Sequence, residues 1–521
     1  MRHMIKKYFK FNIKSIRLSW YIKSFISKKR LKNELKKISN AYQNNLSKEY
    51  SETVVIFTSV PLFTDHVISE YALANEFKNL GMRVVMVFCD KNLPVCHAHD
   101  RYSCGVPPKN SDSINTSKVC NACQKNLSTI KDNSKIEVKK YSSYNQHSNK
   151  IDMKNIDLKE DAYAGTVRYL ATSKIAYSES DPLSINYLKS AKISADVVQA
   201  VIDKENPKVV IAHHGIYIPQ GIVNKVCELN NINFYSWHFG YRKSTLIFSQ
   251  GNTYHKEMGL QRDFENFKNN EKEIITNYLK SRWYGENDWI HFNRSPKKYD
   301  GNNNGKLRIV FYSSVDWDAA LHFDKNVYSN QFDFVSELIN ASNNFTNIDF
   351  IIRVHPAEST GHHPSYSKLD NHIKSLEFGS NVKVIPSSDS TSSYELAESC
   401  DVAIVYNTKL GVELTSMGIP TIVAGESWVR GRGFTWDIDK KEDLSSYLER
   451  IDSLKMTESM KNLALRFAYY FYFQRCLDVP ELESISKKFH ISYNKDINFN
   501  KRGFKLIAEK ILQGKTVSIE S

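Results

Sequence analysis

Polar and charged residues follow three apolar segments in the C-terminal half of the chain, at points where buried strands are expected to end. The segment IDFIIRVHP leads into Arg353, His355 and Pro356, and a proline cannot extend a sheet. Ligands of open α/β sheets bind beyond the carboxyl ends of the strands, so we expect the residues at these ends to share one site. The other candidates are Asn407, Thr408 and Lys409 after DVAIVY, Glu426 after TIVAG, and Ser387, Ser388, Ser390 and Thr391 before a predicted helix.

Each of these residues also has a structural interpretation. Serine and threonine before a helix are ordinary N-caps, and Glu413 stands in the first turn of its predicted helix, where the dipole favours an acid. The functional interpretation is that helix N-termini bind phosphate and that Glu413 accepts hydrogen bonds from ribose hydroxyls. We favour the functional interpretation because all of these residues lie at strand ends of one predicted sheet.

A second group of candidates follows the predicted strands of the N-terminal half. A carboxylate or a neutral imidazole beyond a strand end can act as a general base, and an arginine or a helix N-terminus can compensate a developing negative charge without a metal. A histidine at a strand end is more often structural than catalytic, so the identity of the base stays open. The candidates are Asp65 and His66 after the first strand, His213 and His214 at the end of VVIAHH, and His238 in SWHFG.

Four cysteines cluster within 28 residues: Cys96, Cys104, Cys120 and Cys123, with His97 and His99 between them. The Cys-x-x-Cys pair lets one turn present two thiolates, which predicts a structural zinc site. Reduced thiols in an irregular loop are the main alternative, and redox or iron–sulfur chemistry is a further one. The remaining cysteines fall in predicted strands or helices and are expected to be small core residues.

The order of apolar segments predicts two α/β domains of the doubly wound, Rossmann-like type. A strand–helix–strand unit begins at TVVIFTSVP, and its continuous apolar strands indicate a parallel sheet covered on both faces. A polar stretch near residues 292–305 has the turn residues of a linker, after which strands and helices alternate again. We therefore predict domains at 51–295 and 296–455 that face a cleft, an irregular insertion at 91–160, and a helical tail at 456–521.

Residues 1–50 carry most of the net charge. They hold 14 lysines and arginines against two acids, and so supply +12 of the total of +14; the nearly neutral remainder argues against nucleic-acid binding. Ile5, Phe9, Ile13, Ile16 and Trp20 recur at helical spacing, which is typical of a helix on an anionic membrane surface, although a helix packed on its own domain is the alternative. We find no signal-peptide core and no stretch of about 18 apolar residues. We therefore expect a cytoplasmic protein, peripheral on the inner face of the plasma membrane.

The chain resembles the capsule polysaccharide biosynthesis family. The resemblance rests on RVHP and on DVAIVYNTKLGVELTSMGIPTIVAGESWVRGRGFTWD; it is specific in residues 306–437 and looser in the first domain. That family includes bacterial transferases that add Kdo to a lipid linker, and it adopts the two-domain GT-B glycosyltransferase fold. The Gly-Trp-Gly motif of some Kdo-transferring members is absent here, so the donor sugar stays open.

The resemblance implies a role for each residue of the predicted nucleotide site. His355 would contact the nucleotide phosphate, with Arg353 near it, and Glu413 would hold the ribose. Asn407, Thr408 and Lys409 would line the phosphate side, and Glu426, Arg430 and Arg432 would lie on a loop facing the cleft.

The function implied is that of a glycosyltransferase that needs no cofactor for its chemistry. It would move a sugar, with Kdo as one option, from a nucleotide-sugar, with a CMP-sugar favoured, to a membrane-linked glycan or lipid acceptor. Capsule export machinery would be a further partner. Two alternatives stay open: a polyol-phosphate transferase of the teichoic-acid type, and a non-catalytic subunit of an assembly or export complex.

Overall fold

The structure is a computed structural model of the 521-residue chain. It describes residues 27–42, 50–104, 114–144, 156–174, 181–251, 253–259, 267–268, 270–282, 288, 299, 305–318, 326–360, 364–484, 490–498 and 501–519. The predicted membrane-facing residues from Ile5 to Trp20 lie outside this part of the chain.

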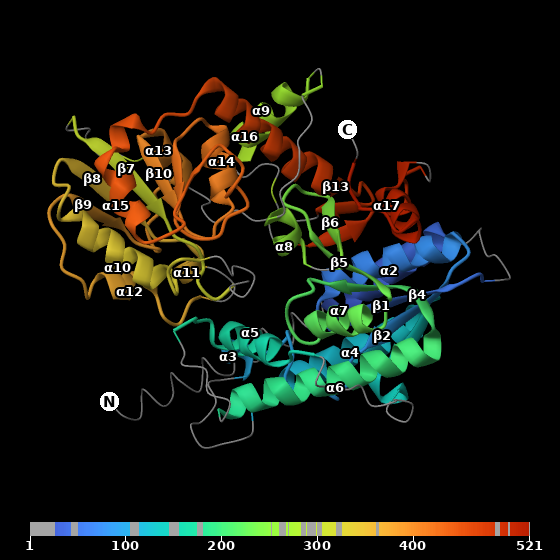
Figure 1. Cartoon of the computed structure of the whole chain (residues 1–521). Helices are drawn as coiled ribbons and strands as arrows, with labels where there is room; N and C mark the ends of the chain where they lie inside the picture. Colours follow the sequence, from blue (N-terminus) through green and yellow to red (C-terminus); the bar gives the residue numbers. More distant parts are fainter. Residues whose placement is uncertain are drawn as a thin grey trace, which may run out of the picture.

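The N-terminal domain is built on a seven-stranded sheet in the order β13-β6-β5-β4-β1-β2-β3 (Figure 1). Its central strands are parallel, and their alternate residues enter different cores: Val54 and Ile56 lie in one, Val55 and Phe57 in the other. Both faces of the sheet are therefore covered, as the continuous apolar strands predicted. The strands are β1 (Thr53–Ser59), β2 (Arg83–Phe88), β3 (Glu137–Lys140), β4 (Pro207–His213), β5 (Asn233–Phe239), β6 (Thr245–Gln250) and, from the tail, β13 (Leu477–Asp478). The main helices of this domain are α2 (Thr64–Asn79), α6 (Pro182–Glu205) and α7 (Gln220–Leu229).

Residues 91–160 differ from the predicted irregular insertion. They contain α3 (Arg101–Cys104), α4 (Ser117–Asn133), β3 and the start of α5 (Lys159–Leu170). β3 pairs with β2 in parallel, so α4 is the crossover helix of a further strand–helix–strand unit at the edge of the sheet. β3 is half-buried along its length, and its sequence EVKK lacks the apolar run by which the other strands are recognised.

The second domain has a six-stranded, fully parallel sheet in the order β12-β11-β10-β7-β8-β9. In β8 (Ile348–Arg353), Phe350 and Ile352 enter one core and Ile351 the other, so this sheet is also covered on both faces. The prediction of two doubly wound α/β domains is confirmed. The other strands are β7 (Leu307–Tyr312), β9 (Val382–Ile385), β10 (Val402–Val405), β11 (Thr421–Val423) and β12 (Trp436–Asp437). The helices include α10 (Gln331–Ser342), α11 (Ala357–Thr360), α13 (Ser393–Glu398), α14 (Leu410–Ser416) and α15 (Glu442–Glu449).

The tail returns from the second domain to the first (Figure 1). α16 (Glu458–Tyr469) packs against α14 and against α9 (Glu271–Arg282), and a π-helical turn, Tyr470–Arg475, follows. β13 (Leu477–Asp478) then joins the N-terminal sheet antiparallel to β6, and α17 (Gly503–Leu512) packs on α2. Between them, β14 (Leu482–Ser484) and β15 (Ile491–Tyr493) form a hairpin. The tail is therefore part of both domains and not a separate helical unit.

Residues 27–41 form a helix that belongs to the N-terminal domain. Leu31, Leu35 and Ile38 are fully buried in the same core as the apolar residues of α2. The described end of the basic segment therefore follows the alternative of a helix packed on its own domain. Among the described helices, none is long and apolar enough to cross a bilayer.

Candidate functional site

His355 stands directly beyond the carboxyl end of β8, as the proline after it predicted. Its N–H donates to Ser313 Oγ (2.8 Å), and its Nδ1 accepts the N–H of Ala357 (3.1 Å), which places the proton of the neutral ring on Nε2. Burial, helped by the charges of Arg353 and Lys409, lowers the pKa of the imidazole to about 4. At neutral pH the ring is therefore an uncharged hydrogen-bond donor through Nε2.

Arg353 faces the protein and not the sheet edge. Its side chain is 1% exposed and donates to the carbonyl oxygens of Val354, Pro386, Asp389 and Thr391. Burial lowers the pKa of its guanidinium. Arg353 thus fixes the loop of residues 386–391 by hydrogen bonds. Its effect on the predicted ligand site is to position this loop.

The serines and threonine of this loop divide into two groups. Ser387 donates to Asp370, and the Thr391 hydroxyl donates to Asp389 (2.6 Å), so both are engaged in holding the loop. Ser388 and Ser390 are exposed. The N-cap of α13 is Ser392, whose Oγ accepts the N–H groups of Tyr394 and Glu395.

Asn407 lies beyond β10 in a left-handed conformation, with φ of +48°. Its Oδ1 is buried and has no hydrogen-bond partner among the described residues. A Cβ at position 425 would stand 2.4 Å from this oxygen, so glycine is needed there for the end of β11 to approach. Neighbouring Glu426 donates its N–H to Asn326 Oδ1 (2.7 Å), and Thr408 Oγ1 accepts the N–H of Leu410. An orphaned buried acceptor at a sheet edge is the kind of atom that a ligand donor satisfies.

Glu413 lies in a buried polar cluster and is 2% exposed. Its oxygens accept hydrogen bonds from Arg282 (3.0 Å), Lys409 (3.1 Å), Tyr472 (3.0 Å) and Tyr394. Burial alone would raise the pKa of the carboxyl, but Arg282, Lys409 and Tyr394 lower it to about 2. Both oxygens are thus occupied by protein groups, and the predicted contact to a ribose stays a prediction.

Arg430 and Arg432 hold the loop that follows β11. Arg430 donates to the carbonyl oxygens of Val423, Gly425 and Ile438, and to Asp439. Arg432 donates to Trp428 O and to Met258 O in α8 (Tyr254–Gly259), and its guanidinium lies 4.2 Å from the ring centroid of Phe467. Both guanidinium groups therefore fix backbone, and Arg432 also joins the loop to α8.

Six histidines gather at the carboxyl end of the N-terminal sheet. The ring of His213 lies 4.1 Å from that of His66 and 5.4 Å from that of His238, measured between centroids. The ring of His214 lies 5.0 Å from that of His238. The histidine cluster, as we name it, consists of His66, His97, His213, His214, His238 and His255.

Burial lowers the pKa of four rings of the histidine cluster: those of His66, His213, His214 and His238. The pKa of His66 falls to about 3, and those of His213 and His214 fall well below the ordinary value. Neither ring nitrogen of His213, which is 4% exposed, has a hydrogen-bond partner in the described part of the chain. The rings of His66, His213 and His214 are therefore neutral at physiological pH.

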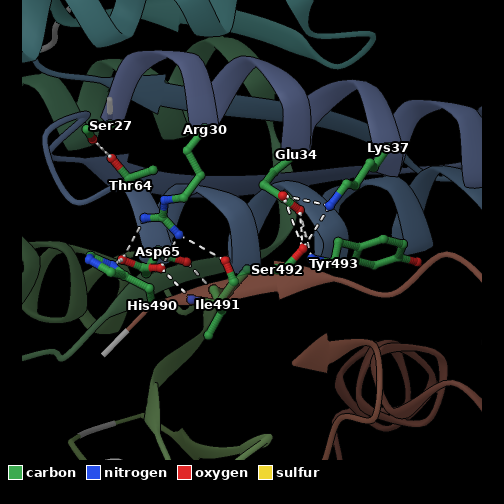
Figure 2. A network of polar contacts seen from close by, with 11 residues as sticks. Ser27, Arg30, Glu34, Lys37, Thr64, Asp65, His490, Ile491, Ser492 and Tyr493 are labelled. Atoms are coloured by element: carbon green, nitrogen blue, oxygen red, sulfur yellow. Dashed lines mark hydrogen bonds and ion pairs between the residues drawn. The ribbon is translucent and has the colours of Figure 1, made fainter. Parts of the chain in front are cut away.

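Asp65, the other predicted base, belongs to a different network (Figure 2). Its carboxylate accepts hydrogen bonds from both terminal nitrogens of Arg30 (2.7 and 2.9 Å) and from the backbone N–H of Ile491 (2.9 Å). Although burial alone would raise it, the hydrogen bonds from Arg30 hold the pKa of Asp65 below its ordinary value. This carboxylate joins the helix of residues 27–41, α2 and β15, which favours a structural role over that of a base.

Cys96, Cys120 and Cys123 lie near one another in the first domain. Cys120 Sγ is 3.6 Å from His99 Nε2, and His99 Nδ1 accepts the N–H of Cys96. Burial raises the pKa of Cys96, Cys120 and Cys123, which favours neutral thiols. Over the described ranges, no three His, Cys, Asp or Glu side chains converge as a metal ion requires. Zinc at Cys96, Cys104, Cys120 and Cys123 therefore stays a prediction that this geometry does not support.

The two groups of candidates meet where the domains touch. The Trp428 ring, on the loop after β11, lies 5.8 Å from the His255 ring, which in turn stacks 6.1 Å from His214. Across the same junction, Tyr217 donates to Asp318 Oδ1 (2.9 Å). The loop after β11 and the segment after β7 thus meet the histidine cluster and Tyr217 at one junction.

Sequence reasoning missed two acids at this junction. Asp316 and Asp318 follow β7, and Asp316 accepts hydrogen bonds from the N–H (2.9 Å) and hydroxyl (2.5 Å) of Ser173 in the first domain. The signal was present in SSVDWD, which follows a predicted strand in the same way as RVHP. His97 was also misplaced: it was grouped with the cysteines, whereas its ring lies 5.7 Å from that of His214.

A scan against protein-family models and a search of curated protein sequences each gave no match. Similar solved structures include KpsC of Thermosulfurimonas dismutans, described as a beta Kdo 2,4 transferase. It is 13% identical, with a TM-score of 0.38, over 55% of this chain and 85% of that chain. The beta Kdo 2,7 transferase of the same KpsC is 15% identical, with a TM-score of 0.34, over 61% and 87%. Sucrose-phosphate synthase from Thermosynechococcus elongatus is 10% identical, with a TM-score of 0.33, over 81% and 95%.

Proposed function

We propose that the chain is a glycosyltransferase that uses a nucleotide-sugar donor and a glycan or lipid acceptor. The observation that carries the proposal is that loops beyond the carboxyl ends of β7 and β11 contact the first domain at the histidine cluster. Neutral imidazoles lie on the side of the N-terminal sheet, and His355, Asn407 and Lys409 lie at the strand ends of the second sheet. Ligands of open α/β sheets bind at such ends.

The two groups divide the reaction between them. A neutral imidazole of the histidine cluster accepts the proton of the acceptor hydroxyl as its oxygen attacks the anomeric carbon. The bond from that carbon to the phosphate oxygen breaks, and the nucleotide departs with the electron pair. His355 Nε2–H and the ammonium of Lys409 face the charge that develops on the phosphate. No step in this scheme needs a metal or a redox cofactor, and a CMP-sugar, with Kdo as one option, is the favoured donor.

Ligand-induced stabilisation tests the donor side. The purified chain is heated with CMP-, UDP- and GDP-sugars, and with CDP-glycerol and CDP-ribitol. A ligand at about 100 times its Kd stabilises the native state by about 2.7 kcal/mol, which raises the melting temperature measurably. We expect one nucleotide-sugar to do so. Stabilisation by a CDP-polyol alone would instead indicate a polyol-phosphate transferase.

The matched variants are His355→Ala and His490→Ala, the latter replacing an exposed histidine outside the site. We expect His355→Ala to lose both transfer and the nucleotide-induced rise, with an unchanged melting temperature of the free protein, and His490→Ala to keep both. Binding without turnover in the wild type would indicate the non-catalytic subunit. Full activity of His355→Ala would exclude the assignment of the donor site.

A further inference from the structure

The outward face of the helix of residues 27–41 carries only cations and amides. Lys28, Lys29, Lys32 and Lys36 are exposed, and the other exposed residues of the helix are Asn33 and Asn40. At 100° per residue the four lysines fall within an arc of about 100°. They therefore form one surface, which we call the lysine face.

In the described part of the chain, no acid forms an ion pair with the lysine face. The single acid of this helix, Glu34, is 4% exposed and points inward, where it accepts hydrogen bonds from Tyr493 N–H (2.8 Å), Ser492 Oγ (3.1 Å) and Lys37 (2.9 Å) (Figure 2). Arg30 points inward as well, to Asp65. Among the described ion pairs, none involves a lysine of the lysine face. Arg30 and Lys37 are thus the cations of this helix that pair with acids, and no described acid pairs with the four lysines of the lysine face.

The helix is held rigidly along its length. Arg30 donates to Asp65 and to Ile491 O (2.9 Å), and Tyr42 donates to Glu76 (2.7 Å) one helix away. Leu31, Leu35 and Ile38 fill the core beneath it. The apolar stripe is therefore buried in protein, so this helix cannot insert into a bilayer and offers a surface charge alone.

The position of the helix relates the lysine face to the proposed site. Ser27 Oγ lies 2.7 Å from Thr64 Oγ1, at the first residue of α2, and Arg30 holds the next residue, Asp65. The residue after that is His66 of the histidine cluster. The helix therefore begins at the same end of the sheet at which the histidine cluster lies. Its preceding residues, 1–26, carry seven lysines and arginines and no acid.

We propose that the lysine face is a docking surface for an anionic lipid bilayer, which presents the domain junction to a membrane-linked acceptor. Charge complementarity favours this partner, because four lysines held on one face of a helix suit a diffuse anionic surface. Each lysine near such a surface contributes about a fivefold gain in binding. The presentation of the junction to an acceptor rests on the proposed function, whereas the docking itself uses no residue of the donor site.

Vesicle sedimentation of the full chain tests this docking surface. Vesicles of phosphatidylcholine with phosphatidylglycerol are compared with pure phosphatidylcholine at low and at physiological salt. The test variant is Lys28→Glu/Lys32→Glu/Lys36→Glu, and the control, Lys189→Glu/Lys192→Glu/Lys204→Glu, makes the same charge change on exposed residues of α6. Circular dichroism and melting temperature establish that both variants are folded.

We expect the wild type and the α6 control to sediment with anionic vesicles only, and less so as salt rises. The lysine-face variant should partition at least about 100-fold more weakly, since three attractive charges are lost and three repulsive ones are added. Equal sedimentation of both variants overturns the proposal, whether both bind or both fail to bind. Equally tight binding of the wild type to polyanions such as single-stranded DNA also overturns it, because the surface would then not be selective for lipid. Thermal stabilisation by nucleotide-sugars, measured on the same variants, separates this outcome from failure of the proposed transfer.

Discussion

Replacement of Glu413 by glutamine distinguishes a structural carboxylate from a ribose contact. The folded-state pKa of about 2, against an ordinary value of 4.5, means that the protein stabilises the ionised form. A depression of this size corresponds to about 3 kcal/mol of folding free energy at neutral pH. That agrees with the cost of about 3–5 kcal/mol for breaking a buried ion pair. Arg282 keeps Asp288 (2.7 Å) as a partner in the variant, so we expect the lower end of this range.

The assay is urea unfolding followed by tryptophan fluorescence. At pH 7 the loss should lower the urea midpoint of Glu413→Gln by about 1 M, and the exposed control Glu449→Gln should not change it. Because the pKa is depressed in the folded state, the stabilisation is present above pH 4.5 and disappears as the pH falls toward 2. The difference between wild type and variant should therefore shrink over that interval. An unchanged midpoint at pH 7, together with weaker nucleotide binding, would refute the structural interpretation and support a ribose contact.

Three further predictions concern groups outside this cluster. Asp65→Asn should weaken the paired hydrogen bonds from Arg30 and lower the free energy of unfolding by about 1–3 kcal/mol. Proteolysis near residue 42 should become faster, and nucleotide-induced stabilisation should stay intact. Loss of that stabilisation would contradict a structural role for Asp65. Arg353→Lys should lower the melting temperature, because an ammonium cannot reach the four carbonyl oxygens that the planar fork spans, and an unchanged melting temperature would be incompatible with this. Metal analysis of the chain beside Cys120→Ser/Cys123→Ser tests the zinc prediction, which the absence of stoichiometric metal in the wild type would contradict.

Local sequence patterns predicted most of the fold, and the errors in the prediction came from contacts between residues far apart in the sequence. Apolar strands separated by amphipathic helices predict parallel sheets covered on both faces, and Pro356 marks where β8 ends. β3 was missed because an edge strand with the sequence EVKK has no apolar run. The return of the tail as β13 was missed because a two-residue strand leaves no periodicity, and its pairing with β6 spans more than 200 positions.

The candidate site shows the same division. The sequence located the strand ends correctly, since strand ends depend on local signals. The sequence could not show which polar side chains hydrogen-bond to other protein groups, because their partners lie far away along the chain. Asp65 accepts a hydrogen bond from Ile491, and Glu413 accepts hydrogen bonds from Arg282 and Tyr472. The spacing of these residues in the sequence predicts none of these contacts. The histidine cluster likewise forms from five separate segments, and only the paired His213 and His214 were adjacent beforehand.

The hydrogen bonds of the arginines near the junction limit which groups could neutralise a donor phosphate. An arginine near a strand end suggests phosphate binding because its planar fork matches an oxyanion. Here, however, Arg353, Arg430 and Arg432 all direct hydrogen bonds to backbone carbonyl oxygens. Carbonyl groups of loops must be satisfied when they are buried, and a guanidinium does so with several donors at once. These arginines therefore shape the loops around the junction. Under the proposed reaction, the charge on the leaving nucleotide would be met by Lys409, whose ammonium already compensates Glu413, and by the neutral donor of His355.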